Sequence, residues 1–508
     1  MKLSNKLFVW FMGVSLVWIM AGCAGLSEEG NSGEEGESNQ ELRAAYDTGI
    51  ISLDPFSSNH GEPATILASR QIYDTLVVND GSEFIGGLAE DWEQEDDLTW
   101  TFTLKDDITF HDGSEVTAED VKVSLEQLIT RGESPLTVLW EVFDSVEAED
   151  DKTVTIKTTE PLGTMLSNLS LLFIVPADHM EQEDFFMNPI GSGPFSVESF
   201  TPEQELILSG YDEYWDGAPN LDTLELVNIP ETSSRMTAIE TGEIDLSWTI
   251  PNDQVTELEG NEDINLVESE SYLYYFNWFN SSREPFDNPK VRRALWHALD
   301  IETIVNDLFG ATGEVMTSPI PNAVYGHSEQ SPYEYDPELA KELLAEAGYP
   351  DGFTTTMMWN EGGGPQILEL QNIMASYWSE IGVEIEPDRL ERAEWIEKLN
   401  ALDWDMDLQT NSVITGDADY TLGRLYISEA NRNGYHNEEL DQLLLDAKQT
   451  TDQEERASLY DQVNQIIWDE AVGIFPVELK QIHAVRSNVK GFEPDPASAP
   501  RLHQVSIE

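Results

Sequence analysis

The stretch Thr99–Leu104 reads TWTFTL and alternates polar with apolar side chains. This period of two predicts a half-buried β-strand in which Trp100, Phe102 and Leu104 face inward. A second alternating stretch, TVTIKT at 153–158, predicts another strand of the same kind. The chain therefore contains strands that bury one face against a core.

Helix signals follow along the chain. Residues 117–120 read TAED, which has the form of a capping box, and apolar residues follow it at helical spacing. Asn288-Pro289, Asp336-Pro337 and Asp452 with Glu455 predict the starts of three further helices. Helices and strands alternate without a strict βα rhythm, so we expect an α/β fold with more than one sheet.

Composition limits what the chain can do. Its 508 residues suggest two or three lobes, and a hydrophobic content of 40% is enough for real cores. Asp plus Glu total 98 against 26 Lys plus Arg, a formal net charge of -72, so nucleic acid is not an expected partner. The acids are spread along the whole chain, which favours a surface suited to high salt over a local cation site.

The N-terminus predicts an anchor. Lys2 and Lys6 precede an apolar run at 7–21, which is typical of a secretory signal peptide. Small residues directly before Cys23, the only cysteine, resemble a lipoprotein cleavage site and imply a lipid on Cys23. We expect residues 1–22 to be a signal peptide and 23–40, rich in Gly, Ser and Glu, to be a flexible tether. The body would then be held on the outer face of a membrane.

Catalytic motifs are missing from the sequence. It contains no HExxH, no GxSxG and no P-loop, and its one cysteine is assigned to the anchor. No two histidines are spaced as metal ligands on one helix turn. We therefore expect a binding protein without catalytic residues, cofactor or metal site.

Four segments carry a further signal: 85–123, 189–195 with Tyr214-Trp215, 276–295 and 335–350. Together they resemble one family, the extracellular solute-binding proteins of peptide, nickel and opine importers (family 5). Within this resemblance, residues 416–420 (GDADY) are similar to the branch that binds glutathione or dipeptides.

The resemblance implies a two-lobe fold like type II periplasmic binding proteins, with an extra subdomain, mixed sheets and a hinge between the lobes. Lobe I would comprise 41–75, 190–270 and 480–508, the inserted subdomain 76–189, and lobe II 271–479.

The resemblance also implies a function. The chain would be the lipid-anchored, extracytoplasmic, monomeric component of an ABC importer, capturing short peptides by lobe closure and passing them to the permease. The alternatives are a carrier of nickel or a metal chelate and, further off, a surface peptidase.

Some candidate ligand contacts, at 416–420 and 61–63, come from the same resemblance, and the others come from the residues themselves. Asp417 or Asp419, with Tyr420 beside them, would receive the peptide amine, because a buried charge needs a counter-ion. For the peptide carboxylate, Arg424, Arg389, Arg392 and Arg283 remain open. Weaker candidates lie in the loop at 61–63, in the aromatic strand at 272–279 and near 359: Gly61, Glu62, Pro63, Asn277, Trp278, Trp359 and Asn360.

Overall fold

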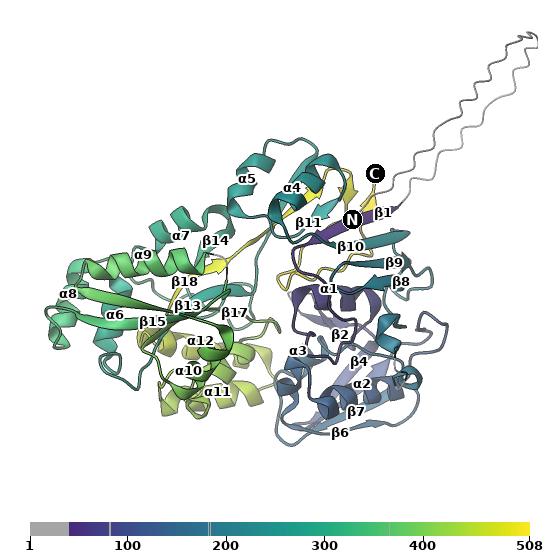
Figure 1. Cartoon of the computed structure of the whole chain (residues 1–508). Coiled ribbons are helices and arrows are strands. Elements are labelled where there is room, and N and C mark those ends of the chain that lie inside the picture. Colours follow the sequence, from purple (N-terminus) through teal and green to yellow (C-terminus); the bar gives the residue numbers. More distant parts are fainter. Residues whose placement is uncertain (1–39, 81–82, 181, 183, 365) are drawn as a thin grey trace, which may run out of the picture. The chain divides into compact units, whose positions relative to one another are not determined.

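The computed structural model of the chain describes residues 40–80, 83–180, 182, 184–364 and 366–508 (Figure 1). The expected signal peptide, Cys23 and nearly all of the expected tether lie outside these residues. Within the described part, no helix is both long and apolar enough to cross a membrane.

A mixed seven-stranded sheet organises what we call the first half, residues 40–269 and 481–508. Its order is β12-β19-β11-β1-β10-β9-β8, and β1 is parallel to both of its neighbours. Helices α1 (Pro63–Ile72), α4 (Thr232–Thr241) and α5 (Asn252–Leu258) belong to the same half. The strands are β1 (Glu41–Tyr46), β8 (Phe195–Thr201), β9 (Glu205–Gly210), β10 (Thr223–Asn228), β11 (Leu246–Ser247), β12 (Ile264–Ser269) and β19 (Gln481–Arg486).

A four-stranded antiparallel sheet extends the first half. Its order is β4-β5-β7-β6, and its core is continuous with that of the larger sheet. The predicted strand 99–104 is β5, and its three inward residues are buried as expected. The predicted helix start is also confirmed, because Asp120 Oδ2 accepts hydrogen bonds from Thr117 N and Oγ1, each at 2.8 Å. The elements are β4 (Ala89–Asp96), β5 (Thr99–Leu104), β6 (Phe143–Ala148), β7 (Thr153–Thr158), α2 (Ala118–Arg131), η1 (Pro135–Trp140) and α3 (Met165–Leu169).

The second half, residues 273–479, has its own six-stranded sheet and its own core. The three predicted helix starts are confirmed, because Asn288, Asp336 and Asp452 each cap a helix with the side chain. In sheet order the strands are β14 (Gly313–Val315), β18 (Gly473–Leu479), β13 (Leu273–Phe279), β17 (Met406–Ser412), β15 (Phe353–Asn360) and β16 (Val383–Leu390). The helices are α6 (Pro289–His297), α7 (Ile301–Leu308), α8 (Pro337–Glu346), α9 (Ile367–Ser379), α10 (Arg392–Ala401), α11 (Glu438–Gln449) and α12 (Gln453–Asp469).

The chain passes between the halves twice, from β12 to β13 and from β18 to β19. Lys480 is the single residue between β18 and β19. Its Nζ lies 2.8 Å from Glu268 Oε1 on β12 and 2.9 Å from Glu314 Oε2 on β14. One ammonium therefore joins a carboxylate of the first sheet to a carboxylate of the second at the crossing point.

A buried ion pair fixes the turn that precedes η5 (Asp419–Gly423), a π-helical turn. Arg456 on α12 donates through Nη1 and Nη2 to the two carboxylate oxygens of Asp417, both at 2.6 Å. Arg456 also donates to Ala447 O and to Tyr460 Oη, so the guanidinium is well satisfied where water does not reach it. This two-bond geometry is the strong form of the arginine–carboxylate pair.

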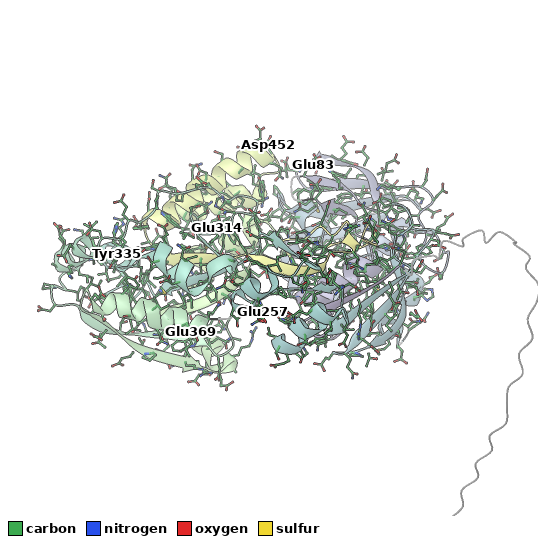
Figure 2. All side chains as sticks on the ribbon, turned by 90° about the horizontal axis from the view of Figure 1, so that it is seen from above. Glu83, Glu257, Glu314, Tyr335, Glu369 and Asp452 are labelled. Atoms are coloured by element: carbon green, nitrogen blue, oxygen red, sulfur yellow. The ribbon has the colours of Figure 1, made fainter. Side chains whose placement is uncertain are left out.

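The surface carries the excess of acid. Figure 2 labels carboxylates on well-separated elements, among them Glu257 on α5, Glu369 on α9 and Asp452 before α12. Exposed like charges repel one another, and that repulsion opposes the compact state.

Thermal stability should therefore rise with NaCl. The rise should be concentrated below about 0.3 M, because the Debye length falls from about 30 Å at 0.01 M to about 8 Å at 0.15 M. Differential scanning fluorimetry across that range, with sucrose as a non-ionic control, measures the effect. A Tm that stays constant there, or rises equally with sucrose, would contradict charge repulsion as the cause.

Asp417→Asn should destabilise the fold by roughly 3–5 kcal/mol, because it leaves the buried Arg456 without its counter-charge. Urea unfolding at pH 7 measures the loss. Asp461→Asn, on the exposed face of α12, is the matched control and should change stability by less than about 0.5 kcal/mol. Equal stability of the Asp417 variant and the wild type would show that the pair is not needed for folding.

Candidate functional site

The two halves touch along a line that we call the seam. Ser167 Oγ on α3 donates to Thr415 O at 3.3 Å, and Gly163 N donates to Lys448 O at 2.7 Å. A Cβ at Gly163 would lie only 2.1 Å from Thr450 O, so the absence of a side chain allows this close backbone approach. The seam therefore brings loops of the first half directly against the segment 415–450 of the second.

A cavity of about 450 Å³ includes Thr415 in its lining, and we call it the hinge-side cavity because Tyr272, at a chain crossing, also lines it. This volume is typical of small-molecule sites. The second half contributes Ile414 and Thr415, the crossing contributes Tyr272, and the first half contributes the remaining wall. Its charged lining residues are Arg70, Arg501, Asp80, Glu493 and Asp495.

Both signs of charge thus face the hinge-side cavity. Arg70 Nη1 donates to Asp495 Oδ2 at 2.9 Å and to Ala499 O at 2.7 Å, which holds the C-terminal segment against α1. Glu493 is exposed in the cavity wall. A cavity of this kind can accept a ligand that carries an ammonium and a carboxylate together.

A second cavity, of about 380 Å³, is also lined from both halves, and we call it the outer cavity. Three of the predicted residues line it: Asp419, Tyr420 and Arg424. The Arg424 guanidinium lies 4.1 Å from the centre of the Tyr420 ring, in cation–π geometry, and Arg424 Nε donates to Tyr420 O at 3.1 Å. The remaining wall is mostly apolar and includes Val138, Leu139, Leu162 and Leu444.

Asp419 is one of three carboxylates that line the outer cavity, with Glu141 and Glu429. Burial raises the pKa of its carboxyl above the usual value, while Arg456 acts in the opposite direction and Asp417 adds to the rise. Its Oδ1 atom is buried and has no hydrogen-bond partner among the described residues. A buried acceptor without a partner is costly, so a donor from a ligand would stabilise it.

Asp417 lies beside Asp419 but has a different environment. Both of its oxygens are engaged by Arg456, and Oδ1 also accepts from Asp419 N at 2.9 Å. Of the two aspartates predicted for the amine, Asp419 is the one that lines a cavity.

The other predicted contacts lie away from both cavities. Asn277 and Trp278 are buried because β13 is an inner strand of its sheet, covered on both faces. Trp359 and Asn360 are also buried, at the end of β15. Glu62 and Pro63 are exposed at the start of α1. Their contact with ligand stays a prediction.

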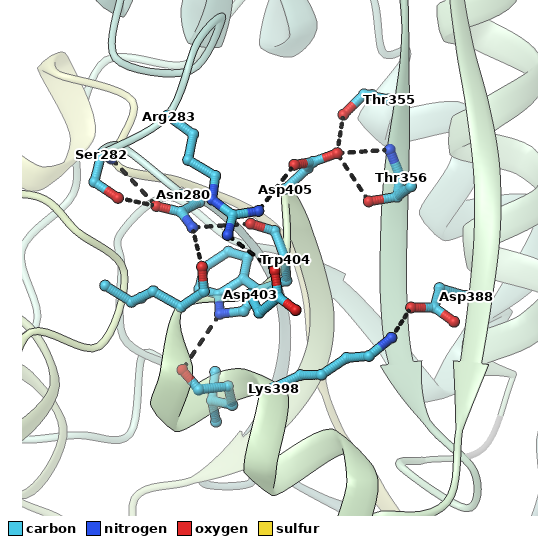
Figure 3. Close-up of polar contacts among 12 residues, drawn as sticks. Asn280, Ser282, Arg283, Thr355, Thr356, Asp388, Lys398, Asp403, Trp404 and Asp405 are labelled. Carbon is cyan, nitrogen blue, oxygen red and sulfur yellow. Dashed lines mark hydrogen bonds and ion pairs between the residues drawn. The ribbon is translucent and has the colours of Figure 1, made fainter.

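The remaining arginine candidates are occupied or distant. Figure 3 shows Arg283 between Asp403 and Asp405, with Nη2 3.0 Å from Asp403 Oδ1. Asp405 also accepts from the Thr356 hydroxyl at 2.9 Å. Arg389 pairs with Glu361, and Arg392 is exposed at the start of α10. Neither cavity is lined by these arginines.

Sequence reasoning missed Arg70, Arg501 and Glu493. The available signal was weak: an Arg-Leu-His alternation at 501–503, in which Leu502 is buried and its two neighbours line the hinge-side cavity. Among the residues that the structure covers, no group of three or more His, Cys, Asp or Glu is placed to hold a metal ion.

Comparison with known proteins shows which family the chain resembles. The middle region of the bacterial extracellular solute-binding proteins, family 5, matches residues 83–433. The chain is 30% identical to the glutathione-binding protein GsiB of Pectobacterium atrosepticum, over 87% of this chain and 89% of that protein.

Two solved structures are similar over 92% of this chain. HbpA2 from Haemophilus parasuis has a TM-score of 0.84 and 27% identity, with all of that chain covered. DppA from Helicobacter pylori, in complex with the peptide STSA, has a TM-score of 0.75 and 28% identity, with 98% of that chain covered. The predicted periplasmic-binding-protein-like fold is thereby confirmed, and the chain belongs to the family 5 extracellular solute-binding proteins.

Proposed function

We propose that this protein is the lipid-anchored, extracytoplasmic receptor of an ABC importer and that it captures short peptides at the seam. Capture would require movement of the two halves about the crossings at 269–273 and Lys480. The captured molecule would leave unaltered and pass to the permease, and Cys23 would hold the receptor at the membrane.

The hinge-side cavity is the observation that supports a short peptide as the ligand. It is lined from both halves and presents arginine and carboxylate side chains together. A short peptide carries both end charges, and each must find a counter-charge when water is excluded. The names of two similar proteins, a glutathione-binding protein and a DppA in complex with a peptide, support the same ligand class.

Two carboxylates are candidates for the peptide amine: Asp419 in the outer cavity and Glu493 in the hinge-side cavity. Asp419 is the residue predicted from sequence, and its buried Oδ1 lacks a donor among the described residues. Glu493 lies in the wall that also holds the arginines. The variants Asp419→Asn and Glu493→Gln each remove one of the two carboxylate charges, with little change in side-chain volume.

Isothermal titration with a panel of two- to five-residue peptides, each free and N-acetylated, should identify binders that need a free amine. The variant at the true contact should weaken the free peptide about tenfold or more relative to the acetylated one, because hydrogen bonds to charged groups are worth about 1.5–3 kcal/mol. Asp461→Asn serves again as the control. If neither variant changes the preference by more than about twofold, amine capture at these carboxylates is wrong.

Native mass spectrometry of the protein as purified from its host distinguishes the ligand classes. We expect retained peptide whose mass is unchanged by incubation with the protein. Retained nickel or a metal chelate would favour the nickel-carrier alternative, and cleaved peptide would favour a peptidase.

A further inference from the structure

Arg501 differs from Arg70, the other arginine of the hinge-side cavity, because its ion pair is long. Among the described residues, its nearest carboxylate oxygen is Asp74 Oδ1, 3.7 Å from Nη1. Its one described hydrogen bond is a long one, from Nη1 to Tyr214 Oη at 3.4 Å. By contrast, Arg70 lies 2.9 Å from Asp495.

Asp74 does not depend on Arg501 for its hydrogen bonds. This fully buried carboxylate accepts from Ser192 Oγ at 3.2 Å, Tyr214 Oη at 3.2 Å and Trp215 Nε1 at 3.0 Å. Burial raises the pKa of the Asp74 carboxyl, an effect that Arg501 opposes only in part. Asp74 therefore takes its hydrogen bonds from neutral donors, and Arg501 acts on it through charge at 3.7 Å. Apart from the long bond to Tyr214, the guanidinium N–H groups of Arg501 have no hydrogen-bond partner among the described residues.

His503 provides a second observation at the same wall. It lines the cavity, is 8% exposed, and has no hydrogen-bond partner for either ring nitrogen among the described residues. The nearest described carboxylate oxygen, on Asp216, is 3.9 Å from Nε2. Burial, and then the neighbouring Arg501, lower the pKa of His503, so near neutral pH the ring is uncharged and offers one N–H.

A guanidinium with one long ion pair, beside a buried imidazole without hydrogen-bond partners among the described residues, is unusual in a chain with 98 acidic and 26 basic side chains. A carboxylate from outside the protein would satisfy both groups at once. Guanidinium presents a planar fork of donors that matches the two oxygens of a carboxylate. Glu493, in the same cavity, offers an opposite charge for the other end of the ligand.

We infer that Arg501, with His503 beside it, anchors the carboxylate of the ligand in the hinge-side cavity. This inference rests on the proposed capture of peptides, but the anchor itself can be tested without a peptide. The arginines predicted from the sequence do not line this cavity, so the inference assigns the carboxylate to the first half of the molecule.

The first test uses acetate alone. Acetate replaces chloride at constant ionic strength, and Tm is followed for the wild type, Arg501→Gln and a matched control, Arg293→Gln. Arg293 lies on α6 in the second half and lines neither cavity. We expect acetate to raise the Tm of the wild type and the control but not that of Arg501→Gln. An equal rise in all three overturns the anchor, whether or not peptides bind.

The second test compares each bound peptide with its C-terminal amide. The wild type should prefer the free carboxylate about ten- to a hundredfold, as expected for a charge-assisted hydrogen bond, and Arg501→Gln should lose that preference. Arg501→Lys, which keeps the charge without the fork, should keep part of it. Circular dichroism confirms that each variant is folded. An unchanged preference in Arg501→Gln overturns the anchor, whereas a wild type that binds no peptide overturns the proposed function and leaves the acetate result to decide Arg501.

Discussion

Scarcity of positive charge governs this structure, because 98 carboxylates share 26 lysines and arginines. The acidic surface repels itself, so each cation stabilises the part of the fold where it pairs with carboxylates. Arg456 lies inside the second half, where it pairs with Asp417 and fixes the turn before η5. Lys480 joins a carboxylate of each sheet at the crossing between the halves. Arg70 fastens the C-terminal segment to α1 beside the hinge-side cavity.

The seam brings together residues of both halves, and neither half alone forms the cavities there. Each half has its own sheet and its own core, so neither needs the other for its packing. Their contacts include backbone approaches at Gly163 and Thr415, and both cavities are lined by residues of the two halves. A site made from two independently packed bodies can change shape without disturbing either core.

Local sequence signals predicted local structure well. The capping boxes and the alternation of β5 depend on residues a few positions apart, and the structure confirms them. The binding residues depend on distant partners. Asp417 is occupied by an arginine 39 positions away, which no local pattern reveals. Both faces of β13 are buried because of its place within the sheet, so alternation could not tell which side would meet a ligand. Arg501 stands out only once its poor contact with Asp74 is measured.

The position of β19 has a consequence for biosynthesis. This strand lies between β12 and β11, yet it comes from residues 481–486 of the chain. A polypeptide emerging from the ribosome therefore cannot complete this seven-stranded sheet until residues 481–486 have been synthesised. Sheets that wait for such remote strands fold slowly. Delayed assembly of this kind keeps a nascent chain incompletely folded, which is the form that an export channel requires.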